Sequence, residues 1–125
     1  MTPQLLKDTA IAFLTTVVSG DVKGAYDLHV GESFRHHNPH FPGDAASLCA
    51  GMEEDERRNP GKTLTVVNAL QDRDRVAVHS MLRRPGGEPD IAVVHLFRFD
   101  GGKIVELWDV AMVAPPAIVN QHGMF

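Results

Sequence analysis

The sequence has very little cysteine: Cys49 is the single one among its 125 residues. One cysteine cannot form an internal disulfide, so a scaffold held together by disulfides is excluded. The start of the chain shows neither a basic leader nor an apolar signal core, and with the lone cysteine this predicts a reducing, cytoplasmic location. No apolar run is long enough to span a bilayer as a helix, so we expect no membrane partner.

Runs of positive charge are also missing. Lysine and arginine occur at most in pairs, such as Arg57-Arg58 and Arg83-Arg84, and the formal net charge is -4. Nucleic-acid binding needs a basic stripe, so we expect no nucleic-acid partner. The motifs GxGxxG, GxxxxGK[ST] and GxSxG are absent as well, which leaves nucleotide cofactors and serine hydrolysis without support. We therefore expect no cofactor.

The chain does contain enough apolar sequence for one core, since 43% of its residues are hydrophobic. This length and composition predict a single domain over residues 1–125. In the first half, apolar residues recur at steps of three and four, which is typical of amphipathic helices. Three helices are expected: one capped by Thr2, one capped by Asp21, and one capped by Asp44 that covers roughly residues 45–58.

The second half predicts four long strands, at about residues 62–71, 75–84, 90–99 and 103–113, with a short strand before them at about 33–38. The turns between the long strands are rich in glycine, proline and aspartate and are too short for crossover connections. They predict an antiparallel meander. The expected fold class is α+β, with three helices closing over the concave face of a strongly curved antiparallel sheet.

The hairpin formed by residues 91–113 holds the most informative pattern. Side chains alternate between the two faces of a strand. If Arg98 and Glu106 point to water together, His95 and Asp109 share the opposite, apolar face. The sequence thus predicts a histidine and a carboxylate side by side on the wall of the core.

The exact pairing depends on the loop over residues 100–102. A three-residue Asp-Gly-Gly loop keeps the shared face and predicts His95 opposite Leu107 and Val93 opposite Asp109. A two-residue loop would shift the register by one and separate His95 from Asp109. We expect the three-residue loop, because it also keeps the two charged residues together outside.

A similar count can be made for the preceding pair of strands. If Arg84 faces Asp90, antiparallel counting brings His79 opposite His95. His79, His95 and Asp109 would then line one cavity. A five-residue loop leaves that register open.

Four segments carry a family resemblance: RHHNPHFPGD (35–44), DRVAVHSMLRR (74–84), VVHLFRFDGGKIVELWDV (93–110) and NQHGMF (120–125). Together they resemble the SnoaL-like polyketide cyclase family of the nuclear transport factor 2-like (NTF2-like) superfamily. The resemblance implies a cone-shaped α+β barrel, usually a dimer packed through the sheet, with a deep apolar pocket between sheet and helices. The superfamily includes polyketide cyclases, a ketosteroid isomerase, other enzymes and noncatalytic binding modules, so the fold leaves the activity open.

The resemblance also implies roles for particular residues. In the polyketide cyclases of this family an aspartate on the last strand is the acid/base in an aldol ring closure, and Asp109 matches it. A desolvated carboxylate is a strong base once ionised, and the enolate that it forms needs a hydrogen-bond donor. His95 or His37 is expected to be that donor; His37 and Asn38 belong to an HNP segment whose histidine tends to face the pocket. Many relatives carry an acidic residue at His95 and a histidine at Leu107, so the acid/base pair is rearranged here.

The expected site therefore has two parts and a separate interface. The catalytic candidates are Asp109, His95, His37 and His79. The candidates for lining the ligand pocket are Phe34, Asn38, Phe41, Met52, Met81, Phe97 and Leu107. Trp108 falls on the opposite face with Ile104, Glu106, Val110 and Met112, and this apolar outer face predicts a homodimer interface.

Three functions fit these residues. The first is a cofactor-independent lyase or isomerase that acts on a small hydrophobic carbonyl compound, with Asp109 as the base. The second is a noncatalytic pocket for an apolar metabolite, in which Asp109 only accepts structural hydrogen bonds. The third is a metal site built from several of His36, His37, His40, His79 and His95, although no HExxH or paired-cysteine spacing supports it.

Overall fold

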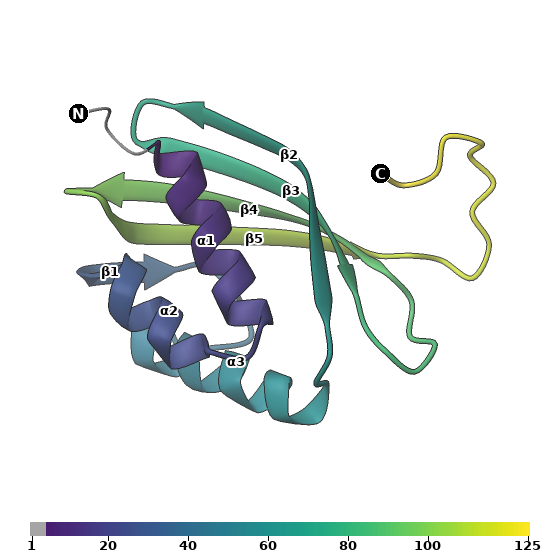
Figure 1. The fold of residues 1–125 in the computed structure, drawn as a ribbon, viewed down its shortest axis with the longest axis horizontal. Helices are drawn as coiled ribbons and strands as arrows, with labels where there is room; N and C mark the ends of the chain where they lie inside the picture. The colour runs from purple at the N-terminus through teal and green to yellow at the C-terminus, as the bar shows by residue number, and fades with distance from the viewer. Residues whose placement is uncertain (1–4) are drawn as a thin grey trace.

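A computed structural model describes residues 5–125 of the chain. Its elements, in order, are α1 (Leu6–Val18), α2 (Val22–His29), β1 (Val30–His36), α3 (Ala45–Arg58), β2 (Thr63–Asp72), β3 (Arg75–Arg83), β4 (Ile91–Asp100) and β5 (Lys103–Val113). The helix α1 crosses one face of the sheet, α2 and α3 lie near β1, and the C-terminal tail leaves the end of β5 and then bends back (Figure 1). The ring of Phe125 at its end lies 6.4 Å from that of His79 on β3. The predicted α+β class is confirmed.

The helix starts follow the predicted caps. The Asp21 side chain accepts a hydrogen bond from the backbone N–H of Gly24 at 3.1 Å, and Asp44 accepts one from Ser47 at 2.8 Å. Each bond satisfies an N–H that would otherwise lack a partner in the first turn. The predicted cap at Thr2 lies outside the described residues. Over the described residues, no helix combines the length and apolar character needed to cross a membrane.

The sheet has the strand order β1-β5-β4-β3-β2. Strands β2 to β5 form the predicted antiparallel meander, but β1 pairs with β5 in parallel, so the sheet is mixed and the expectation of an antiparallel sheet was wrong. A parallel pair needs a long connection, and here α3 and three strands separate β1 from β5. Because β1 and β2 are both edges, the curved sheet stays open and does not close into a barrel.

The hairpin β4–β5 differs from the prediction in its register. Its loop has two residues, Gly101 and Gly102, and Val105 is an extra residue on β5 that forms a β-bulge. The two-residue loop alone would have placed His95 and Asp109 on opposite faces of the hairpin. The extra residue of the bulge shifts the register by one and returns both side chains to the same face. His95 therefore pairs directly with Asp109. The predicted shared face is correct, and the predicted pairing is wrong by two residues.

The core fills the space between the helices and the sheet. Phe97 is fully buried at its centre, with its ring centroid 6.1 Å from that of Phe13 on α1 and 6.2 Å from that of Phe99. Burial of one such side chain contributes about 2–3 kcal/mol. Ile104 was expected on the outer face, but it belongs to this core because it precedes the bulge.

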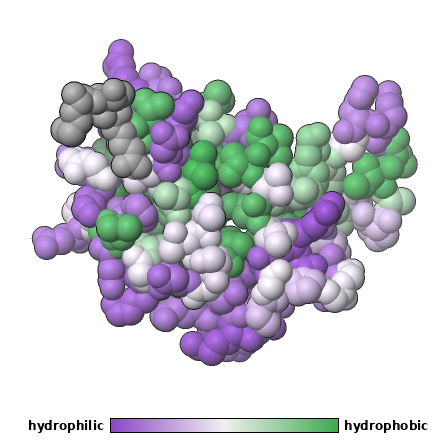
Figure 2. Space-filling view, viewed as in Figure 1, coloured by the Kyte–Doolittle hydropathy of each residue, from purple (hydrophilic) through white to green (hydrophobic). Residues whose placement is uncertain are grey.

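Polar side chains gather over α3, at the bottom of the view in Figure 2, whereas hydrophobic side chains gather over α1 and the strands beside it. On α3, Glu54 pairs with Arg57 at 2.6 Å and with Arg58 at 2.9 Å. These charges keep the outer side of the helix in water, so α3 covers the edge of the core with its apolar side.

Candidate functional site

Asp109 lies on the core-facing side of β5 and is partly exposed. Its Oδ2 accepts a hydrogen bond from the side-chain amide of Asn38 at 3.1 Å. Asn38 reaches it because β1 runs parallel to β5, with His36 paired to Leu107, so that the chain after β1 passes beside Asp109. The other oxygen, Oδ1, accepts no hydrogen bond from a described residue. One carboxylate oxygen is thus held in place and the other is free.

His95 faces Asp109 across the β4–β5 ladder. Its Nδ1 is buried and has no hydrogen-bond partner within residues 5–125, although the residue as a whole is partly exposed. Desolvation lowers the pKa of His95 to about 4, and the nearby negative charge of Asp109 offsets only part of this effect. The imidazole is therefore neutral near pH 7. A neutral ring has one N–H donor and one acceptor nitrogen.

Tyr26 is a site residue that the sequence did not reveal. It is 7% exposed, and its hydroxyl makes no hydrogen bond to a described residue. Burial raises the pKa of Tyr26, with smaller effects from Cys49 and Asp109, so the phenol stays protonated. The sequence showed only that Tyr26 lies on the apolar side of a helix. What surrounds its hydroxyl depends on how α2 packs against α3.

His37 does not lie with Asp109. It projects from the outer side of the sheet, where its ring stacks on that of Trp108 with centroids 5.0 Å apart. Its Nε2 lies 2.7 Å from Oε2 of Glu106. The expectation that His37 faces the pocket and supplies a donor beside Asp109 was therefore wrong, because its ring lies on the opposite face of the sheet.

His36 takes the inward position instead and is 6% exposed. Its Nδ1 accepts a hydrogen bond from the backbone N–H of Asn38 at 3.1 Å, and its Nε2 donates to the carbonyl oxygen of Pro42 at 2.6 Å. Both ring nitrogens are occupied, so His36 fixes the loop that carries Asn38. We assign it a positioning role.

The outer face holds a second polar cluster, centred on Glu106. Glu106 was expected to point to water, but it is 5% exposed because charged side chains cover it. Its carboxylate accepts hydrogen bonds from Arg35 at 3.2 Å and Arg98 at 3.0 Å in addition to His37. Hydrogen bonds from Arg35 and His37 and then Arg98 lower the pKa of Glu106 to about 2. Arg98 and Glu106 do pair, as predicted.

His79 also lies on the outer face. Val78 occupies the place opposite His95, so the alignment of β3 was wrong by one residue and His79 points away from Asp109. Its Nδ1 is 3.0 Å from the amide nitrogen of Asn68. Met81 is two residues further along β3 and shares this outer side, so it does not face the core either.

Most of the remaining residues that were predicted to line the pocket belong to the hydrophobic core or pack against it. Phe34, Phe97 and Leu107 are buried in the core, and Phe41 and Met52 pack against it. Phe41 lies so close to Gly51 of α3 that a Cβ there would approach its Cε1 to 2.3 Å. The loop after β1 is thereby pressed against α3.

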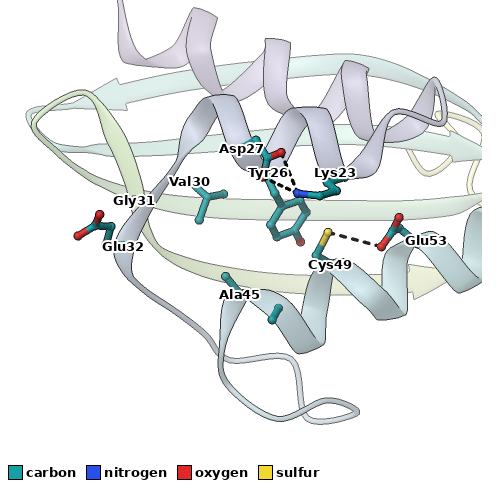
Figure 3. Close-up of a pocket in the computed structure, with 10 residues that line it drawn as sticks. Lys23, Tyr26, Asp27, Val30, Gly31, Glu32, Ala45, Cys49 and Glu53 are labelled. Atoms are coloured by element: carbon teal, nitrogen blue, oxygen red, sulfur yellow. Dashed lines mark hydrogen bonds and ion pairs between the residues drawn. The ribbon is translucent and has the colours of Figure 1, made fainter.

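A cavity of about 530 Å³ lies elsewhere, between α2, β1 and α3 (Figure 3). Its lining residues are Lys23, Tyr26, Asp27, Val30, Gly31, Glu32, Ala45, Ala46, Cys49 and Glu53. Neither Asp109 nor His95 contributes to it, and none of the predicted pocket residues does. The acid/base pair thus does not line the cavity, although the Asp109 charge acts on Tyr26, which does.

A metal site finds no geometric support in the part of the chain that the structure describes. There, no three His, Cys, Asp or Glu side chains come close enough together to hold a metal ion. His36 and His37 point to opposite faces of the sheet, so they cannot act as neighbouring ligands.

The open curved sheet covered by three helices places the protein in the NTF2-like class of α+β folds. The chain matches the model of the SnoaL-like domain over residues 10–107, and it belongs to that family. No protein of curated function matches the sequence.

Several solved structures share the fold at low identity. AclR from Streptomyces galilaeus, described as a candidate hydroxylase, is 22% identical, with 85% of this chain and 77% of that chain covered and a TM-score of 0.73. IdmH from Streptomyces antibioticus, described as a candidate polyketide cyclase, is 19% identical, with 86% and 92% covered and a TM-score of 0.72. An NTF2-like protein of unknown function from Cytophaga hutchinsonii is 17% identical, with 90% and 95% covered and a TM-score of 0.69.

Proposed function

We propose that the protein is a cofactor-independent lyase or isomerase that carries out acid/base chemistry of the polyketide-cyclase type on a small hydrophobic carbonyl compound. The observation that carries this proposal is the direct pairing of Asp109 with a neutral His95, with one Asp109 oxygen held by Asn38. Family membership and the description of IdmH as a candidate polyketide cyclase support the reaction class.

The free Oδ1 of Asp109 removes a proton from the carbon next to the substrate carbonyl. The C–H electron pair becomes the enolate double bond, and negative charge moves to the carbonyl oxygen. A nearby N–H donor, supplied by His95, stabilises that oxygen. In an aldol closure, the enolate carbon then attacks a second carbonyl carbon, and the new alkoxide takes the proton back from Asp109.

The low pKa of His95 suits this role. A neutral imidazole donates a hydrogen bond to an enolate oxygen without adding a positive charge that would hold Asp109 in an ion pair. Asn38 is a positioning residue, because its amide fixes Oδ2 and leaves Oδ1 directed elsewhere. Each group thus has one task in the proposed reaction.

A noncatalytic binding function is the second candidate. It is favoured by one observation: the 530 Å³ cavity lies away from Asp109, and Phe97 and Leu107 fill the core next to the pair. On this proposal Asp109 stabilises the end of the sheet through Asn38. Replacing Asp109 by Asn would then leave ligand affinity nearly unchanged.

Aldol ring closure tests the first candidate. Heptane-2,6-dione and aryl-substituted diketones cyclise to conjugated enones, which absorb in the ultraviolet. We expect wild-type protein to accelerate closure of at least one member of this series and Asp109→Asn to lose about 100-fold or more of that rate. Asp100→Asn, a matched change at the exposed end of β4, is the control. Binding by both proteins without turnover by either would favour the second candidate.

We also propose that the protein is a homodimer in the cytoplasm, packed through the outer face of the sheet. Val94, Val110 and Met112 are 40%, 72% and 65% exposed there and form an apolar patch. Trp108 lies beside this patch, partly covered by His37. Light scattering should give a dimer for wild type and a monomer for Val110→Asp; a monomeric wild type would contradict the proposal.

A further inference from the structure

The cavity between α2, β1 and α3, here called the α2–α3 pocket, has the size of a small-molecule site. Figure 3 shows Lys23 and Tyr26 of α2 facing Cys49 and Glu53 of α3 across it. The catalytic proposal uses none of these side chains. The pocket therefore needs an explanation of its own.

Tyr26 supplies a hydroxyl group at the wall of the pocket. Its side chain is almost fully buried, yet its hydroxyl has no hydrogen-bond partner among residues 5–125. The ring projects from α2 into the pocket, with the hydroxyl toward Cys49 (Figure 3). The hydroxyl is not one of the fully buried polar atoms that lack a partner, so it is accessible from the pocket, and a group that enters can hydrogen-bond to it.

The charges around the pocket favour a cation. Lys23 is paired with Asp27 at 2.9 Å, which offsets much of its positive charge, and it also lies near Glu53. Glu53 makes no ion pair with a described residue, and its one side-chain hydrogen bond to a described residue comes from the Cys49 thiol at 3.9 Å, which is a weak donor. Glu32 adds another negative charge at the rim but points away from Tyr26 (Figure 3). The lining thus carries three carboxylates and one ammonium, which is a net negative charge.

The thiol and the phenol are neutral, so neither adds a charge to the pocket. Burial raises the pKa of Cys49, as does the neighbouring Glu53 carboxylate, so the thiol stays protonated. Glu53 and Glu32 are thus the lining charges without an ion pair among the described residues, and Glu53 is the one near Tyr26 and Cys49 (Figure 3).

We propose that the α2–α3 pocket binds a small organic cation, a primary amine on an apolar or aromatic body. The ammonium donates hydrogen bonds to the Glu53 carboxylate and to the Tyr26 hydroxyl oxygen. The apolar body packs against Val30, Ala45 and Ala46, which line the same pocket. Neither Asp109 nor His95 lines this pocket.

Three probes of similar size test the charge preference: 2-phenylethylammonium, 2-phenylethanol and 3-phenylpropanoate. Ligand-observed NMR or calorimetry on the wild-type protein should rank the ammonium tightest and the carboxylate weakest. Glu53→Gln should weaken ammonium binding at least ten-fold, because a charge-assisted hydrogen bond is lost. Glu54→Gln is the matched control, since Glu54 is the next residue of α3, pairs with Arg57 and lies outside the pocket.

Two further variants locate the site. Tyr26→Phe should weaken ammonium binding several-fold, and Asp109→Asn should weaken it less than Glu53→Gln does, because Asp109 does not line the pocket. Equal affinities for the three probes, no saturable binding of the ammonium, or equal losses in Glu53→Gln and Glu54→Gln would overturn the proposal. A larger loss in Asp109→Asn than in Glu53→Gln would overturn it too, because the probe would then sit at the acid/base pair. Circular dichroism checks that each variant is folded.

Discussion

Removing the charge of Glu106 should change how the stability of the protein depends on pH. Glu106 accepts hydrogen bonds from three side chains. Arg35 lies on β1, His37 directly follows β1, and Arg98 lies on β4. Glu106→Gln keeps the size of the side chain and removes the negative charge. The three donors would then surround a neutral amide, and the tie between the edge strand β1 and the meander would weaken.

The size of the effect follows from the pKa. The hydrogen bonds lower it from 4.5 to about 2, and at ~1.4 kcal/mol per pKa unit the full stabilisation is ~3 kcal/mol. The Arg35 and His37 side chains are 65% and 46% exposed, so solvent screens part of it, and about 1–2 kcal/mol is a better estimate. Since the folded-state pKa of Glu106 is the lower one, this stabilisation is complete above about pH 4.5 and is lost as the pH falls toward 2.

Urea unfolding of wild type and Glu106→Gln, at pH 7 and at pH 2.5, measures this difference. At pH 7 the variant should be about 1–2 kcal/mol less stable, and at pH 2.5 the gap should largely close. Glu88→Gln, at an exposed turn residue, is the control and should match wild type at both values. A gap between wild type and Glu106→Gln that stays constant with pH would refute the reasoning.

Three other substitutions have clear expectations. Ser80 is fully buried and its Oγ has no partner among the described residues, so Ser80→Ala should keep or raise the free energy of unfolding, by up to ~1 kcal/mol; a marked loss would contradict this. Gly51→Ala would push a Cβ against Phe41 and should cost about 1–3 kcal/mol in chemical denaturation, partly recovered by adding Phe41→Leu. Asp21→Ala removes the bond to the Gly24 N–H and should cost about 1 kcal/mol; Asp21→Asn should cost much less, and equal losses would show that capping is not the cause.

The features that the sequence predicted well depend on local chemistry. Asp21 and Asp44 cap their helices because the bond is made within three residues, and no other part of the chain needs to be known. The four long strands begin and end within two residues of the prediction, since glycine and aspartate turns mark them. The shared face of His95 and Asp109 follows from alternation along a strand.

The features that the sequence did not predict depend on contacts far along the chain. The bulge at Val105 cannot be recognised from the alternation of apolar and polar residues in the sequence. It nevertheless decides which residue of β5 pairs with His95. The parallel pairing of β1 with β5 turns His36 inward and His37 outward, the reverse of the expectation. A shift of one residue in β3 moves His79 to the other face. In each case one residue of register changes which side chains meet.

The same reasoning explains why Tyr26 and Glu53 were not found as a pair. They lie on different helices, 27 positions apart in the printed sequence, and only the packing of α2 against α3 brings them to one pocket. Helical periodicity places each of them on a face but does not report which helices become neighbours.

The central claim is that Asp109 acts as a base beside a neutral His95, and proton exchange tests it most directly. The measurement is the rate at which wild type and Asp109→Asn exchange the α-protons of 2-tetralone and related ketones for deuterium in D2O, followed by NMR. The account predicts acceleration by wild type and a loss of about 100-fold or more in Asp109→Asn, with Asp100→Asn unchanged. Equal exchange rates for wild type and Asp109→Asn would contradict it.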